Sequence, residues 1–188
     1  MTPTPSHPDF ALEEYRALRA TIRERGTARQ IVSALTFVAW AAGALWLSSH
    51  PTSAALTLIP LVVLAAGFEV IFAAHVGVER IGRYIQTTYE HPDSPLPAWE
   101  QTAMRFGALP GAATSADPLL VRLFTLTTLV NLLPIALAQT TRPAMAELGQ
   151  IALVVLVHLA FALRVFQAQR FAHSQRARDL DLFKQLGK

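Results

Sequence analysis

Four polar side chains interrupt the most apolar parts of the sequence, one in each of four separate stretches. They are Ser33, Glu69, Arg122 and His158. An ionisable group inside a membrane is costly, and by default it is a candidate functional site. Glu69 has the chemistry of a proton carrier, and Arg122 that of its counter-charge or of an anion ligand. The interpretation that we favour is structural: Glu69 and Arg122, with His158, form a buried ion pair that fixes helix register.

A second group of chemically capable residues lies within nine positions: His75, Glu79, Arg80 and Arg83. His75 and Glu79 are four residues apart, so they share one face of a helix. Together the four could supply acid–base chemistry and contacts to a phosphate. The plainer interpretation is a set of helix-surface pairs where a membrane helix leaves the bilayer, and we call these residues the interfacial cluster.

No cofactor or metal ion is expected. Haem would need two opposed axial ligands, but His75 lies 24 residues and His158 15 residues from the preceding turn. That difference is roughly 13 Å of helix rise. The chain has no Cys, which excludes thiolate metal sites, iron–sulfur clusters and thiol catalysis. It has neither a G-x-S-x-G motif nor a glycine-rich phosphate loop, so we expect no catalytic residue.

Composition indicates the class of protein to which these residues belong. Of 188 residues, 52% are hydrophobic and only 15% are charged, and the mean hydropathy is +0.35. Soluble domains are usually about one quarter charged. These values exclude a disordered chain, a coiled-coil rod and a typical nucleic-acid-binding domain, and they predict an integral membrane protein.

The spacing of charge predicts an all-α bundle of four transmembrane helices in one domain. Three stretches lack Asp, Glu, Lys and Arg: 30–68, 123–141 and 148–163. One crossing needs about 20 apolar residues, so the first stretch is long enough for two. The predicted spans are 30–49, 53–78, 118–139 and 144–166. Counted from the outer turns, the four polar residues lie 15 to 18 positions deep, and we call them the intramembrane polar layer.

Basic residues set the predicted orientation. Of the 16 Lys and Arg residues, 14 lie before the first span, between the second and third, or at the end of the fourth. The positive-inside rule therefore predicts a cytoplasmic N-terminus, central loop and C-terminus. Segment 1–29 holds charged residues and no apolar core, so we expect no signal peptide. Short outer loops and an Arg/Ala-rich composition favour a bacterial inner membrane.

The segments outside the membrane are also predicted to be helical. Segment 1–29 forms an amphipathic helix that ends at Gly26, and the loop 79–117 carries a short helix over about 98–106 with Trp99 and Phe106 as anchors. The tail 167–188 continues the fourth span as a helix, because no breaker appears before Gly187. Breaks are predicted at 50–53 and 91–95, and a helix cap at 115–118. Asn131 and Pro134 form a kink-prone point in the third span.

Three functions remain open from sequence. The first is a non-catalytic accessory or assembly subunit of a membrane complex, with anionic lipid headgroups and a protein partner or a second copy as its contacts. The second is a small oligomeric transporter or channel that uses Glu69, Arg122 and His158. The third is a membrane enzyme that acts on a lipid or quinone through the interfacial cluster. The absence of a catalytic motif favours the first, without nucleic acid as a partner.

Overall fold

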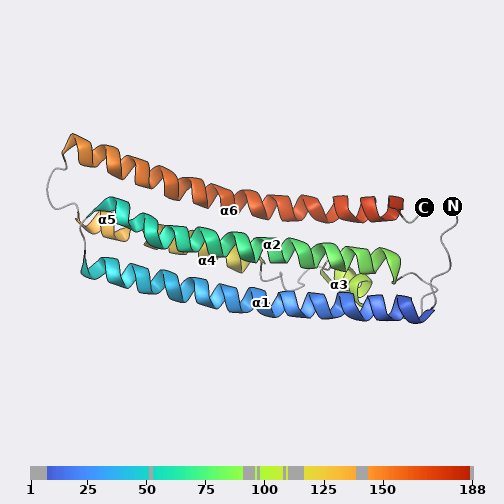
Figure 1. Ribbon diagram of the computed structural model, residues 1–188. Helices are drawn as coiled ribbons and strands as arrows, with labels where there is room; N and C mark the ends of the chain where they lie inside the picture. Colours follow the sequence, from blue (N-terminus) through green and yellow to red (C-terminus); the bar gives the residue numbers. More distant parts are fainter. Residues whose placement is uncertain are drawn as a thin grey trace. The chain divides into compact units, whose positions relative to one another are not determined.

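The computed structural model describes residues 8–50, 53–90, 96, 98–107, 109, 117–138 and 144–186. All elements in these residues are helical, which confirms the predicted class (Figure 1). In chain order they are α1 (Pro8–Ser49), the single 3-10 turn η1 (Ala54–Thr57), α2 (Leu58–Thr88), α3 (Trp99–Gly107), α4 (Asp117–Val130), α5 (Leu133–Ala138) and α6 (Met145–Leu186).

Three helical segments are long and apolar enough to cross a membrane: Phe10–Ser49, Ala54–Thr88 and Met145–Leu186. By length and composition the chain is therefore a helical membrane protein. The third predicted span differs from these three. Its counterpart is a shorter apolar stretch, Leu120–Ala136, which a turn at Asn131 and Leu132 divides into α4 and α5.

Pro134 explains why α4 ends where it does. A proline ring clashes with the carbonyl of the residue four positions earlier and has no N–H to donate to it. That residue is Val130, the last of α4. The chain turns through hydrogen bonds from Asn131 N to Thr127 O, at 2.9 Å, and from Leu132 N to Leu129 O, at 3.0 Å. The kink-prone point is thus a complete break between two helices.

α1 and α6 each run for 42 residues without a break. The helix predicted to end at Gly26 instead continues into the first apolar stretch. Gly26 interrupts no regular hydrogen bond, and a helical glycine costs only about 0.5–1 kcal/mol relative to alanine. The predicted breaks at 51–52 and 91–95, and the predicted cap at 115–116, lie outside the described residues.

The described residues group into two compact units, although one domain was expected. The charged unit comprises residues 1–29, 73–114 and 172–188, and the apolar unit comprises 30–72 and 115–171. α1, α2 and α6 contribute residues to both units.

An aromatic cluster forms the core of the apolar unit. The rings of Phe68 and Phe124 lie 5.2 Å apart edge to face, and Phe161 packs on Phe68 at 5.9 Å. Edge-to-face pairs of this kind add about 0.5–1.5 kcal/mol to the gain from burial. α1 packs tightly on α2 at Gly67, where an added Cβ would lie only 2.1 Å from Thr36 Oγ1. Glycine is therefore required for this approach.

Aromatic rings also pack within the charged unit. Tyr15 of α1 meets Tyr89, just after α2, with ring centroids 5.7 Å apart. Tyr84 of α2 lies 5.6 Å from Phe183 of α6. Ile85 and Tyr89 are buried. These contacts connect three helices around a small core and leave the polar side chains to form the site described next.

Candidate functional site

The intramembrane polar layer does not form one connected site among the described residues. Glu69 accepts a hydrogen bond from Arg164 Nη2 at 2.8 Å, whereas Arg122 is exposed on α4 and makes no described ion pair. The expected Glu69–Arg122 pair is thus replaced by Glu69–Arg164. Arg164 is held over the rings of Phe68 and Phe72, 5.8 and 5.2 Å from their centroids, and cation–π attraction stabilises this position.

His158 belongs to a separate buried cluster in the apolar unit. Its Nδ1 lies 2.8 Å from Val154 O, and Asn131 Nδ2 lies 2.9 Å from its Nε2. Asn131 Nδ2 also donates to Thr57 O at 2.7 Å, which fixes this atom as the amide nitrogen. The ring therefore donates through Nδ1 and accepts through Nε2, the pattern of a neutral imidazole. Both ring nitrogens of His158 and the amide nitrogen of Asn131 thus have protein partners, which fits a structural role.

Ser33, the remaining member of the layer, is half-buried on α1. The buried polar residue of that stretch is instead Thr36, whose hydroxyl donates to Val32 O at 2.7 Å. Among the described contacts, Glu69 and His158 have different partners.

The interfacial cluster gains partners from two other helices of the charged unit. Arg83 Nη2 donates to Glu79 Oε2 at 2.5 Å along α2. Arg80 Nε lies 3.5 Å from Asp179 Oδ2 of α6. Arg29 of α1 places Nη1 3.0 Å from His75 Nδ1. An arginine can only donate, so His75 Nδ1 accepts, and Nε2 carries the proton of a neutral ring.

A hollow opens between α2 and α6 beside these residues. Its lining residues are His75, Val76, Glu79, Arg83, Ala172, Gln175, Arg176 and Asp179. Sequence reasoning identified the contributors from α2 but missed those from α6. A usable signal was present, because positions 172, 175, 176 and 179 follow helical spacing and therefore share one face.

Two arginine side chains, those of Arg83 and Arg176, line the hollow. Arg83 is only 3% exposed, and its Nε is buried without a hydrogen-bond partner. Arg176 is half-exposed and makes one long contact, 3.8 Å from its Nε to Glu79 Oε2. Glu79 and Asp179 also line the hollow, so two carboxylates balance the two guanidinium charges there.

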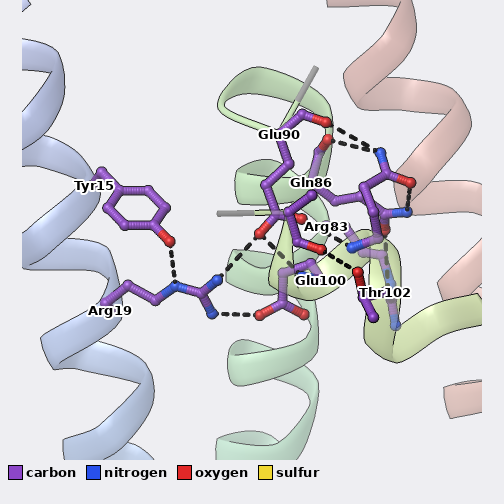
Figure 2. A network of polar contacts seen from close by, with 9 residues as sticks. Tyr15, Arg19, Arg83, Gln86, Glu90, Glu100 and Thr102 are labelled. Carbon is purple, nitrogen blue, oxygen red and sulfur yellow. Dashed lines mark hydrogen bonds and ion pairs between the residues drawn. The ribbon is translucent and has the colours of Figure 1, made fainter. Parts of the chain in front are cut away.

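A buried carboxylate connects α1, α2 and α3 a few residues further on (Figure 2). The side chain of Glu90 is completely buried and lies 3.1 Å from Arg19 Nη2. Its two oxygens accept hydrogen bonds from the backbone N–H groups of Glu100 and Gln101, at 3.0 and 2.8 Å. Glu90 therefore caps the first turn of α3, where a helix has unsatisfied N–H groups and favours negative charge.

Arg19 completes this network. It donates to Tyr15 Oη at 3.1 Å and to Glu100 Oε1 at 2.6 Å. Burial on its own lowers the pKa of Arg19, but the hydrogen bonds to Tyr15 and Glu100 outweigh it and raise the pKa above its ordinary value. The guanidinium thus stays charged and joins Glu90 to Glu100.

The network fixes which face of α3 is turned outward. Glu100, Gln101 and Met104 face α2, where Gln86 Nε2 contacts both Gln101 Oε1 and Met104 Sδ. Trp99 and Phe106 are 63% and 59% exposed, and Leu109, just beyond the helix, is 59% exposed. A water-soluble amphipathic helix has the opposite orientation, with its apolar face inward. We call Trp99, Phe106 and Leu109 the α3 apolar face.

Comparison with known proteins returned no relative of this chain. No family matches it, and neither a curated protein nor a solved structure does. Within the described residues, no group of three or more His, Cys, Asp and Glu side chains could hold a metal ion.

Proposed function

We propose that the chain is a non-catalytic accessory or assembly subunit of a membrane complex, which binds a protein partner through the α3 apolar face. The observation that carries this proposal is the inverted orientation of α3. Large exposed apolar patches on soluble surfaces mark interaction sites, and tryptophan and phenylalanine are favoured at interface centres.

The position of α3 supports a protein rather than lipid as the occupant. α3 contacts α2 at Gln86, which is eleven residues past His75 and therefore about 16 Å further along the helix axis. His75 is paired with Arg29, the last charged residue before the first apolar stretch. The headgroup layer on each side of a bilayer is only about 5–7 Å thick, so a residue 16 Å from its inner edge is in water.

The pairing of the ionisable groups also favours a non-catalytic role. Glu69 is paired with Arg164, Glu90 with Arg19, and Glu79 with Arg83. The first two pairs join different helices, and the third lies along α2. The transport alternative requires Glu69, Arg122 and His158 to lie along one path. Glu69 and His158 have separate partners, which favours the accessory-subunit role over transport.

The proposal includes the finer topology expected from sequence. α4 and α5 together form the third of four spans, with their break at Asn131 inside the bilayer. Both termini and the charged unit lie on the cytoplasmic side, in a membrane of the bacterial inner type. The span of α1 offers a second contact for partner helices, because only 11% of its apolar window is buried, compared with 39% for the window in Ala54–Thr88.

Native mass spectrometry of the chain purified in a mild detergent tests this function. We expect a second protein chain at a fixed stoichiometry, and we expect the double variant Trp99→Ala, Phe106→Ala to lose it. Leu182→Ala removes a similarly exposed apolar side chain near the end of α6, 56% exposed, and serves as the matched control. A monomer that is stable without a partner, or a partner retained by the double variant, would contradict the proposal.

A further inference from the structure

We infer that Arg25 of α1, which lies against Gly77 of α2 in the charged unit, binds the phosphate of an anionic membrane lipid. This inference is independent of the α3 apolar face and of the partner proposed for it. It rests on three observations about Arg25, which concern the position of its guanidinium group, its charge and its depth.

The first observation is that a glycine fixes the position of the guanidinium group. At Gly77 an added Cβ would overlap Arg25 Nη1 and would lie 3.6 Å from its Cζ. Only glycine therefore lets the end of this side chain lie against the backbone of α2. Ordering a long side chain costs conformational entropy when a ligand binds. A guanidinium that is already held in place avoids part of that cost.

The second observation is that no carboxylate neutralises Arg25. The side chain is exposed, and it makes no hydrogen bond or ion pair within the described part of the chain. Glu79, two residues beyond the glycine on α2, is already paired with Arg83 and Arg176. Glu24 adjoins Arg25 in sequence, but consecutive residues of a helix do not face each other. The planar N–H donors of Arg25 therefore remain available for phosphate, which they fit in parallel pairs.

The third observation is depth. Arg29, the last charged residue before the stretch 30–68, places Nη1 3.0 Å from His75 Nδ1, and this contact marks the inner edge of the headgroup layer. Arg25 lies four residues, or about 6 Å, further out along α1, and Gly77 lies two residues, or about 3 Å, further out along α2. The headgroup layer is about 5–7 Å thick. The guanidinium of Arg25 is therefore at the level of the lipid phosphates.

The test measures retention of phosphatidylglycerol by the full chain in mixed phosphatidylglycerol and phosphatidylcholine micelles, using native mass spectrometry. Both lipids carry a phosphodiester, but choline neutralises its charge in phosphatidylcholine. We expect the wild-type chain to retain phosphatidylglycerol selectively. Arg25→Gln should weaken this binding about tenfold, the effect of losing one charge-assisted hydrogen bond. Arg23→Gln is the matched control, because Arg23 is also exposed and two positions along a helix bring it to the opposite face.

Gly77→Ala tests the glycine contact without changing any charge. The new Cβ displaces only the flexible end of Arg25, so we expect a folded chain that binds phosphatidylglycerol as weakly as Arg25→Gln does. Combining Gly77→Ala with Arg25→Gln should cause no further loss, because both substitutions remove the same interaction.

Millimolar inorganic phosphate distinguishes the two sources of a phosphate group. Lipid that is retained in its presence supports a headgroup site, whereas displacement of the lipid assigns Arg25 to a soluble phosphate and overturns the lipid as its ligand. Wild-type binding by Gly77→Ala overturns the inference, and so does an equal loss caused by Arg23→Gln. In both cases the lipid would respond to the net charge of α1 and not to the position of Arg25.

Discussion

Glu90 and Arg19 meet at 3.1 Å between Oε1 and Nη2, and the Glu90 side chain is wholly buried. The pair differs from a surface salt bridge because the same carboxylate also accepts hydrogen bonds from two N–H groups in the first turn of α3, those of Glu100 and Gln101. Removing one partner of a buried ion pair is costly, because the other charge stays buried without compensation. The stability of the charged unit and the position of α3 therefore depend on one side chain.

We expect Glu90→Gln to lower the free energy of unfolding by about 2–3 kcal/mol, the range for losing charged hydrogen bonds. Thermal unfolding in detergent, followed by circular dichroism, measures the change. Glu13→Gln is the control, since the Glu13–Arg16 pair is exposed and such pairs contribute little. A loss no larger than that of the control would mean that Glu90 does not anchor α3.

Gly67→Ala should disrupt the close approach of α1 and α2 in the apolar unit. The new Cβ would lie 2.1 Å from Thr36 Oγ1 and 2.4 Å from its Cγ2, and overpacking of this kind costs about 1–3 kcal/mol. Because Gly26 has nothing within 4 Å of an added Cβ, Gly26→Ala should stabilise the chain by about 0.5–1 kcal/mol. The midpoint temperature of thermal unfolding should thus fall for Gly67→Ala and rise for Gly26→Ala.

Thr36 provides an internal check on the Gly67 prediction. Adding Thr36→Ala to Gly67→Ala removes both of the closest atoms and should recover part of the lost stability. If the double variant is no more stable than Gly67→Ala alone, the cost of that substitution has a source other than contact with Thr36.

Replacing Asn131 with leucine should destabilise the apolar unit by about 1–3 kcal/mol, because Thr57 O and His158 Nε2 would lose their donor in a buried environment. Thr125→Val offers the contrasting substitution. The Thr125 hydroxyl is buried without a partner, so its removal should leave stability unchanged or raise it. Chemical unfolding of both variants under one set of conditions gives the comparison, and equal effects would refute the role given to Asn131.

Alkaline pH should destabilise the charged unit through Tyr89. Burial, together with Glu14, raises the pKa of the Tyr89 phenol above its ordinary value of 10.0. The unfolded chain therefore releases this proton at a lower pH than the folded chain does. The stabilisation is fully present below about pH 10 and is lost progressively as the pH rises above it.

Thermal unfolding between pH 8 and 11, approximately, checks this sign. Wild-type stability should decline above pH 10 more steeply than that of Tyr89→Phe, whereas the two pH profiles should run parallel below pH 8. The difference in slope is the relevant quantity, since Tyr89→Phe also removes a hydroxyl group. Parallel profiles above pH 10 would contradict the expectation.

Much of the helical fold follows directly from the spacing of charged residues and from the positions of helix-breaking residues in the sequence. Charge-free stretches predicted four spans, three of which correspond to the long apolar helices. Asn131 and Pro134 predicted a kink-prone point, where the structure has a turn after Val130. The continuity of α1 through Gly26 was less accessible, since glycine marks a helix end in some contexts and is tolerated inside a helix in others.

The partners within the candidate site were hardest to predict, because they depend on the rotation of one helix against another. Counting residues from the outer turns predicted that Glu69 pairs with an arginine at the same depth, Arg122. In the structure its partner is Arg164, which is held over the rings of Phe68 and Phe72. Similarly, the hydrophobic pattern of segment 98–106 predicted an amphipathic helix. Its inverted orientation follows from Glu90, a distant residue that no local pattern reveals.

The side-chain amide of Asn131 has a consequence for biosynthesis. It bonds Thr57, which is translated earlier, and His158, which is translated later. When α4 and α5 first emerge from the ribosome, only one of the two acceptors exists. The second bond, from Asn131 to His158, forms only once α6 has been made. The order of synthesis thus prevents α4 and α5 from completing their polar contacts before α6 has been made.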